Sequence, residues 1–392
     1  MNYRTGALSF AFFTILICCR TESNETKSIS KDIFTLNPIK EINFRIDSIT
    51  PLNSISMWYF EGKNNEPYFS YAVNKFKYKI FSLTEQNEVF GVNIKKEGPD
   101  GISSVRGGLF PLNENEFLIG EMSTPHIYRI DREGNILGKY NYAIDSKYGR
   151  NTDAGTTRFG NKPFVVENGK IYGGDFFFGP WGNWEESYVF SKPLILEIDT
   201  TNGGTGSTLP ITLPKNLWDN GARLPLPLYD FAQGHFVLSI TGDHNVYKVG
   251  FDGTISSYRA KSRYINEFED YPLKATPPEY FKYYVLNGAY NSIIYDKYRD
   301  IYYRFVILPD NPNEEIDWLR AKKHPKRSSI IILDNEFRVL GETLLPKDKH
   351  YIYNSFVSRD GLYISNSHLD NPEIKEDILT FTLFKYEQYH DK

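Results

Sequence analysis

Three histidines recur at comparable places along the chain, and their recurrence raises the question of a metal site. His126, His244 and His368 each lie in the loop that precedes a strand-like run or directly at its start. A metal ion needs converging ligands that are themselves held by hydrogen bonds. A polar residue at the start of a strand has a simpler role, because it can satisfy free backbone groups. We therefore interpret the three histidines as features of a repeat, and we expect no resident metal and no cofactor.

A loop rich in aromatic residues is the second candidate for chemistry. Residues 176–190 include seven aromatic side chains, and Gly179 and Gly182 give this backbone freedom. Aromatic rings provide large rigid contact faces at little entropic cost. We expect Trp181 and Trp184 to be at least partly exposed at a rim that captures carbohydrate or peptide. The predicted rim comprises Trp181, Trp184, Phe178, Tyr188, Glu121, His126, Asp243, His244 and His368. The alternative is that the aromatic side chains of the long connections pack as a lid on the fold.

Composition excludes several classes of protein. The chain has 392 residues, of which 40% are hydrophobic and 24% charged, as in ordinary globular proteins and unlike disordered or collagen-like chains. A net charge of −4 gives no electrostatic footprint for nucleic acid. The aromatic share of 16% favours β-structure. The sequence contains no nucleophile-elbow, zinc-protease or phosphate-loop motif.

The amino terminus predicts export. Arg4 precedes twelve mostly apolar residues, 7–18, which as a helix would span about 18 Å. That is too short for a membrane core of about 30 Å and is typical of a secretory signal peptide. The chain then becomes polar at once over residues 20–27.

The end of the apolar run resembles a bacterial lipobox. It reads Leu16-Ile17-Cys18-Cys19, and Cys19 lies in the register of the cysteine that receives the lipid. Cys18 occupies the position before cleavage, where a small residue is usual, so both cysteines stay open as the lipidated one. A plain signal peptide with two unmodified thiols is the alternative. We expect an exported protein that is anchored by lipid to the bacterial outer membrane, on either side of it.

The rest of the chain repeats one pattern of strands. Residues 116–140 read as strand, loop, strand, glycine turn and strand, and residues 235–258 copy this order. Comparable apolar runs are centred on Ile80, Ile127, Ile195, Val246, Ile330 and Phe381. The shorter spacings of 47 and 51 residues match a four-stranded propeller blade of about 40–50 residues. The longer spacings predict insertions between second and third strands, residues 309–327 among them.

The number of strands predicts how the ring closes. The last repeat has no fourth strand before Lys392, whereas residues 41–47 form an unused strand near the other end. Pairing the two would hide both sheet edges. The predicted fold class is all-β, a six-bladed β-propeller whose last blade is completed by an N-terminal strand. The predicted organisation is a signal peptide with lipobox at 1–19, a polar tether at 20–35 and the propeller at 36–392. Six unrelated meanders in two sandwiches are the alternative.

One repeat resembles the blade signature of NHL-type and TolB-type six-bladed propellers. The matching residues are 116–121, 126–131 and Gly134. With the lipobox, the chain is similar to propeller lipoproteins of Gram-negative envelopes, a resemblance that implies a location and a fold but no activity. We favour a binding or scaffold protein with a carbohydrate or peptide partner. The alternative is an enzyme similar to metal-dependent propeller lactonases, which would use the rim carboxylates Glu121, Asp175 and Asp243.

Overall fold

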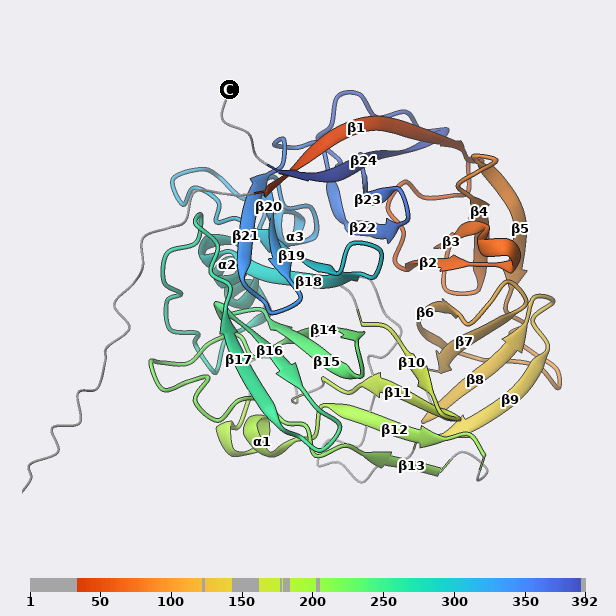
Figure 1. Cartoon of the computed structure of the whole chain (residues 1–392), viewed down its shortest axis with the longest axis horizontal. Coiled ribbons are helices and arrows are strands. Elements are labelled where there is room, and N and C mark those ends of the chain that lie inside the picture. Colours follow the sequence, from red (N-terminus) through yellow and green to blue (C-terminus); the bar gives the residue numbers. More distant parts are fainter. Residues whose placement is uncertain are drawn as a thin grey trace, which may run out of the picture. The chain divides into compact units, whose positions relative to one another are not determined.

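A computed structural model describes residues 34–121, 124–142, 162–176, 178, 184–201 and 205–388. In these residues the strands form six antiparallel sheets of four strands each, arranged around a ring (Figure 1). We number these sheets as blades 1 to 6 in chain order. The all-β, six-bladed propeller predicted from the repeats is confirmed.

The blades have the following strands. Blade 1 contains β2 (Met57–Glu61), β3 (Pro67–Ala72), β4 (Lys77–Ser82) and β5 (Asn87–Asn93). Blade 2 contains β6 (Val105–Pro111), β7 (Glu116–Glu121), β8 (His126–Asp131) and β9 (Ile136–Asn141). Blade 3 contains β10 (Val165–Glu167), β11 (Lys170–Gly174), β12 (Ile195–Asp199) and β13 (Thr205–Thr208). Blade 4 contains β14 (Pro227–Ala232), β15 (His235–Ile240), β16 (Asn245–Val249) and β17 (Ile255–Arg259). Blade 5 contains β18 (Ala289–Asp296), β19 (Ile301–Ile307), β20 (Ser328–Asp334) and β21 (Val339–Leu344). Blade 6 contains β22 (Tyr351–Ser358), β23 (Gly361–Ser365), β24 (Ile378–Gln388) and β1 (Phe34–Arg45).

The apolar runs found in the sequence are the third strands of the blades. The six anchor residues lie on β4, β8, β12, β16, β20 and β24, one in each blade. β4 and β20 are buried on both faces along almost their whole length, because the neighbouring blades cover them. In β20, for example, Ile330, Ile331 and Ile332 are all fully buried. A strand covered on both sides reads as a continuous apolar run, which is why the sequence pattern located it.

The first strand of the chain completes the last blade, as predicted. β1 pairs antiparallel with β24, from Phe34 opposite Gln388 to Arg45 opposite Ile378. The register shifts between Pro38 and Lys40, where proline has no N–H to donate to the ladder. The strand is longer than residues 41–47, and it begins two residues before the predicted boundary of the propeller.

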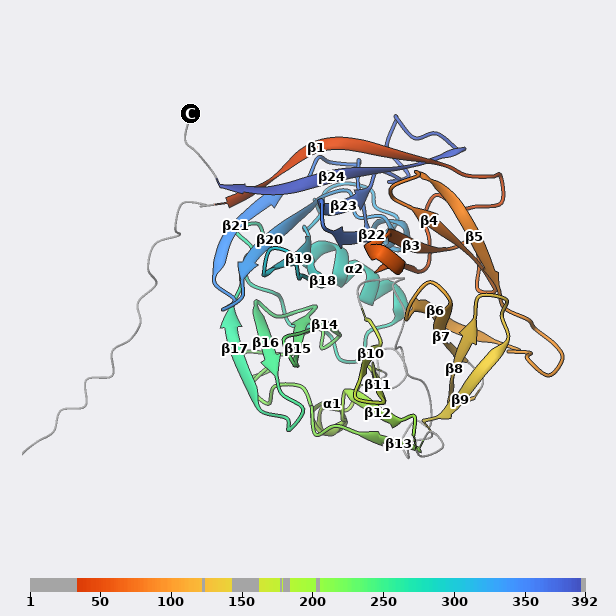
Figure 2. The ribbon, with the colours of Figure 1, turned by 45° about the vertical axis from the view of Figure 1, so that its right-hand side comes forward.

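Three helices lie in the long connections between strands. α1 (Glu186–Ser191) joins β11 to β12, and α3 (Trp318–Lys323) joins β19 to β20. α2 (Pro277–Asn287) joins blade 4 to blade 5 and begins at Thr276, whose backbone N–H and hydroxyl both donate to Glu279. Together, Figures 1 and 2 place α1 and α2 behind the blades in the view of Figure 1. No helix in the described part of the chain is both long and apolar enough to cross a membrane.

Candidate functional site

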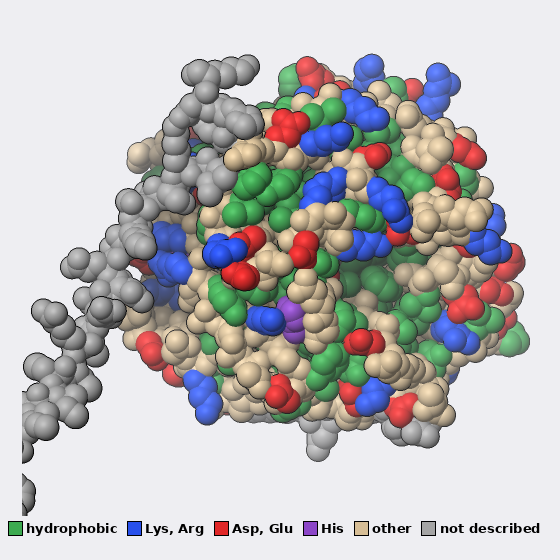
Figure 3. All heavy atoms as spheres, viewed as in Figure 1, with side chains coloured by type: hydrophobic (Ala, Val, Ile, Leu, Met, Phe, Trp, Pro, Cys, Tyr) green, Lys and Arg blue, Asp and Glu red, His purple; other side chains and the backbone are tan. Residues whose placement is uncertain are grey.

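The innermost strands of the ring surround a cavity of about 270 Å³. It is lined by residues of β2, β6, β14, β18 and β22, and by Pro163 just before β10. Figure 3 views the face seen in Figure 1, and near its centre hydrophobic side chains lie in a hollow bordered by Lys and Arg. The cavity walls are largely aromatic, and include Trp58, Tyr59, Phe110, Tyr295, Tyr353 and Phe356.

Trp58 contributes a ring to the wall of this cavity. Its side chain is only 7% exposed, and its ring packs edge-on against Phe110 with 5.0 Å between the ring centroids. The indole nitrogen is buried and has no hydrogen-bond partner among the described residues. Because this nitrogen has almost no accessible surface, Trp58 offers the cavity its ring and not its N–H.

Asp230 brings a carboxyl group from β14 to the same cavity. One of its oxygens accepts from the Phe231 backbone N–H and the other from the Tyr295 backbone N–H, both at 2.8 Å. Burial raises the pKa of Asp230 to about 7, although the two backbone hydrogen bonds favour the ionised form. Within the described residues, no Lys, Arg or His nitrogen lies within 4.0 Å of this carboxylate. A carboxyl group that titrates near neutral pH inside a cavity is typical of functional sites.

A charged cluster holds one end of the cavity together. Glu61 at the end of β2 accepts hydrogen bonds of 2.9 Å from Lys297, Tyr298 and Arg359, which follow β18 and β22. Burial alone would raise the pKa of Glu61, but these three donors lower it to about 2. The Tyr298 hydroxyl also lies 3.3 Å from the Tyr59 hydroxyl. The carboxyl ends of three innermost strands therefore meet at this mouth.

An aromatic lid covers the strands at their other ends. We define it as Trp184, Tyr271, Tyr280, Tyr283 and Tyr284, which all come from the long connections and are all buried. Tyr271 is the centre of the lid, with ring centroids 5.3 Å from Trp184 and 5.1 Å from Tyr283.

Two contacts join the lid to the wall of the cavity. The hydroxyl of Tyr353 on β22 donates to the Lys322 carbonyl of α3 at 2.9 Å. The Lys322 ammonium group lies 5.0 Å from the centroid of the Tyr284 ring and 5.5 Å from that of Tyr280. These contacts place α2 and α3 at the start of β22, on the side away from Glu61.

The lid corrects one prediction from the sequence. Trp184 was expected to be at least partly exposed, but it is only 6% exposed, and Phe178 is buried as well. The physical reason is that the connection containing α1 packs against the connection before α2, so the rings face one another and not the solvent. The alternative, aromatic side chains packed as a lid, describes these residues. Tyr188 lies half-buried on α1, while Trp181 and Cys19 lie outside the described residues.

The predicted acidic residues are held separately in three blades. Glu121 in blade 2 accepts from Tyr128 at 2.8 Å, from Ser103 at 3.1 Å and from Thr124. Asp175 in blade 3 forms an ion pair of 2.6 Å with Lys192. Asp243 in blade 4 accepts from the Tyr247 hydroxyl. Each carboxylate therefore has local partners.

The three predicted histidines also lie in different blades. His126 is half-buried, and its Nδ1 lies 2.6 Å from the Thr124 hydroxyl. His244 is buried, with Nδ1 2.7 Å from the Tyr290 hydroxyl, and burial lowers its pKa to about 3. His368 is fully buried, and its Nε2 donates to the His324 carbonyl at 3.1 Å. His126 is thus held within blade 2, whereas His244 of blade 4 and His368 of blade 6 each contact a residue of blade 5.

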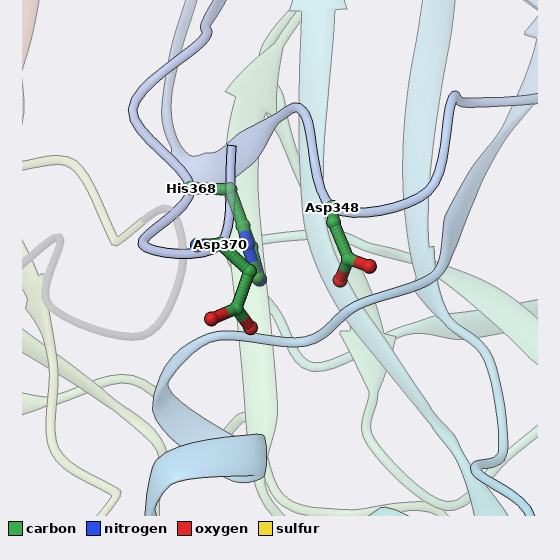
Figure 4. Close-up of side chains that lie close together, drawn as sticks. All are labelled: Asp348, His368 and Asp370. Carbon is green, nitrogen blue, oxygen red and sulfur yellow. Dashed lines mark hydrogen bonds between the residues drawn. The ribbon is translucent and has the colours of Figure 1, made fainter. Parts of the chain in front are cut away.

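One group of possible metal ligands includes His368. Asp348, His368 and Asp370 have ligand atoms within 4.8 Å of one another, and no other such group occurs in the described ranges (Figure 4). Asp370 is paired with Arg320 at 2.5 Å, and its backbone N–H donates to His368 Nδ1 at 3.1 Å. Both His368 nitrogens are thus engaged, and a cation would have to compete with Arg320 for Asp370. We interpret this group as structural.

The residues that line the cavity were missed in the sequence. The signal that could have located Asp230 is its place in the middle of a strand-like run, Pro227–Ala232, where aspartate is unfavourable. Trp58 gave no comparable signal, because an aromatic residue is ordinary in a strand. Which innermost strands face one another depends on the closed ring, and no local pattern reports it.

Comparisons with known proteins place the chain in a family. A family model described as a domain of unknown function, DUF4221, matches residues 34–344. A crystal structure of a DUF4221 family member from Bacteroides vulgatus is 26% identical, with a TM-score of 0.78, over 91% of this chain and 99% of that one. A candidate exported protein from Bacteroides fragilis is 10% identical, with a TM-score of 0.52, over 92% and 98% of the two chains, and it shares the fold alone. No curated protein matches the chain significantly. Since the family model covers more than half of its length, this chain belongs to the DUF4221 family.

Proposed function

We propose that this protein is an exported, lipid-anchored binding protein whose central cavity takes a small ligand, a carbohydrate or a part of a peptide. The observation that carries the proposal is the aromatic cavity whose wall holds the carboxyl group of Asp230. Small-molecule sites are typically apolar and aromatic concave surfaces with few, well-placed polar groups. Here Asp230 is such a polar group.

Support for export and anchoring comes from the amino-terminal sequence. The apolar run of residues 7–18 and the lipobox-like Leu16–Cys19 motif are the features that argue for it. The candidate exported protein from Bacteroides fragilis, which has the same fold, is consistent with this location. The anchor would hold the binding cavity at a membrane.

Binding explains the site better than metal-dependent hydrolysis does. A hydrolase of the lactonase type would require Glu121, Asp175 and Asp243 to converge on one ion. These carboxylates come from three blades, and each is held by its own neighbours. The cavity contains a different acid, Asp230, with no second carboxylate among its lining residues.

The test is a binding screen with full-length protein against arrays of immobilised glycans and peptides. Trp58→Phe replaces the indole by a smaller ring and removes part of the aromatic contact face, so it should weaken binding severalfold. Trp318→Phe is the matched control, because Trp318 lies on α3 and does not line the cavity. Equal binding by the Trp58 variant, or the absence of binding to either array, would contradict the proposal.

A further inference from the structure

We infer that the cavity recognises a ligand with an ammonium group, which binds Asp230 and is held against the aromatic side chains of the cavity wall. The inference rests on the binding function proposed above and narrows its ligand class. A peptide amino terminus and an amino sugar both carry an ammonium group close to oxygen acceptors.

The first argument is the charge of Asp230, with which no Lys, Arg or His in the described ranges forms an ion pair. The two backbone N–H groups of Phe231 and Tyr295 fix the orientation of the carboxylate but bring no net charge. Lys297, the cation that lines the same cavity, is 2.9 Å from Glu61 and is neutralised there. A buried charge without a partner is unfavourable. A ligand ammonium group would supply the missing partner, which a neutral sugar cannot do.

The second argument is the aromatic wall around this acid. Tyr59, Tyr295 and Tyr353 line the cavity together with Trp58. Aromatic faces carry negative electrostatic potential and attract cations, and ammonium ligands are commonly held by such faces. An acid surrounded by aromatic rings therefore matches a cation with some apolar surface.

The third argument is the position of Trp58 relative to Asp230. Trp58 lies on β2 of blade 1 and Asp230 on β14 of blade 4, which are on opposite sides of a six-membered ring (Figure 1). A ligand that binds Asp230 would therefore meet the Trp58 ring on the opposite wall of the cavity.

Asp230 is the group whose titration should govern binding between pH 5 and pH 7. Burial raises the pKa of every tyrosine near it, so these hydroxyls stay neutral in this range. Glu61, with a pKa of about 2, stays ionised. The titratable groups that share the cavity with Asp230 are Tyr59, Tyr295, Lys297, Tyr298 and Tyr353, and Tyr302 on β19 lies near it. Because the ammonium group binds the ionised carboxylate, affinity should rise as the pH rises towards 7.

The experiment is calorimetric titration of the full chain with two matched pairs of probes. Glucosamine is compared with glucose, and alanyl-alanine with its N-acetyl derivative, so each pair differs in the ammonium group. We expect at least one ammonium probe to bind about tenfold or more tightly at pH 7 than at pH 5, and its neutral partner to bind weakly at both. Which pair responds identifies the source of the ammonium group.

Variants assign the effect to the two residues. Asp230→Asn should weaken the ammonium probe about tenfold or more and remove the rise between pH 5 and pH 7. Affinity should fall again above pH 8 in both proteins, because the amine of the ligand then loses its proton. Asp219→Asn removes one negative charge at an exposed position and should change nothing. Trp58→Phe should weaken the ammonium probe severalfold without altering its pH profile.

Two results would overturn the inference. Equal affinity for the charged and neutral members of a pair, with sensitivity to Trp58→Phe, would reject ammonium recognition and leave the binding function intact. Failure of both ammonium probes to bind at pH 7 would also reject it, and the array screen would then judge the binding function separately.

Discussion

Asp230 is a buried carboxyl group, so its titration couples the stability of the fold to pH. Its pKa is raised from 3.8 to about 7 by burial, so between these values the folded protein keeps a proton that the unfolded chain loses. The contribution of this group to the free energy of unfolding therefore falls as the pH rises from about 4 to 7, and is constant above that.

Asp230→Asn removes this pH dependence. The NH2 group of the asparagine side chain would face one of the two backbone N–H donors, and this contact lowers the free energy of unfolding at every pH. Relative to the native protein, however, the variant should gain stability from pH 4 to pH 8, by up to ~4 kcal/mol at about 1.4 kcal/mol per pKa unit. Urea unfolding at both pH values measures the change, with Asp219→Asn as control. A stability difference that does not vary with pH would contradict the assignment.

Arg304 joins blade 5 to blade 4 through a fully buried guanidinium group. Its five N–H groups donate to the Ser239 hydroxyl and to four backbone carbonyls, those of Asp243, His244, Asn245 and Ala260. The group also lies 3.5 Å from the centroid of the Tyr290 ring. Every donor is used, so this arginine is structural.

Arg304→Lys should lower the free energy of unfolding by ~3 kcal/mol or more. Lysine has three donors on one nitrogen and leaves buried carbonyls without partners. The control is Arg338→Lys, since Arg338 is largely exposed and pairs with Asp334 at the surface, where such a pair is worth about 0–1 kcal/mol. Urea unfolding of the two variants should separate them, and equal losses would show that the network of Arg304 contributes little.

At the scale of elements, β1 is the strand on which closure of the ring depends. Phe44 is fully buried, and its ring contacts those of Phe69 and Phe381 at 5.1 and 6.0 Å, which joins blade 1 to blade 6. Deleting residues 36–50 should expose the edge of β24 and cause aggregation. Phe44→Ala is the milder test and should cost about 3–5 kcal/mol, whereas Ile39→Ala, at an exposed site of the same strand, should cost little. A stable, monomeric deletion protein would contradict this role of β1.

The aromatic lid is the second element with a measurable role. Trp184 is buried against Tyr271, so Trp184→Ala should lower the free energy of unfolding by about 3–5 kcal/mol. Tyr264→Ala is the control, because Tyr264 is exposed in the connection that contains Tyr271. Thermal unfolding distinguishes the two variants. If Trp184→Ala left the melting temperature unchanged but abolished ligand binding, Trp184 would have the ligand-binding role that the sequence predicted for it.

For the whole molecule, the lipid anchor proposed above would decide where the cavity is displayed. Cys19→Ala should abolish labelling with radioactive palmitate and move the protein from the membrane fraction to the soluble envelope fraction. Cys18→Ala is the matched control and should keep the label. If the label persists in the Cys19 variant and disappears in the Cys18 variant, the lipid is attached to Cys18. If neither the wild-type protein nor either variant is labelled, the lipid anchor is rejected.

The sequence predicted those features of the fold that depend on local residue patterns, and it missed those that depend on contacts between distant parts of the chain. The third strands and the closing strand were predictable, because burial between blades imposes continuous or alternating apolar runs on Ser328–Asp334 and on Ile42, Phe44 and Ile46. The cavity was not, because Trp58 and Asp230 are far apart in the sequence and meet only when six blades close. The exposure of Trp184 was mispredicted for the same reason, since its partner Tyr271 lies in another blade's connection.

The pairing of β1 with β24 also has a mechanical consequence. Phe34 lies opposite Gln388, so both chain ends leave the sheet at the same end of the seam. Consider a force that pulls the residues before Phe34 along the direction of β1 while the rest of the ring is held in place. This force loads all the hydrogen bonds between β1 and β24 in shear, so they resist it together. Tension between the two ends would instead peel the ladder one pair at a time. The seam is therefore oriented to resist a pull on the chain before Phe34, and it yields when both ends are pulled apart.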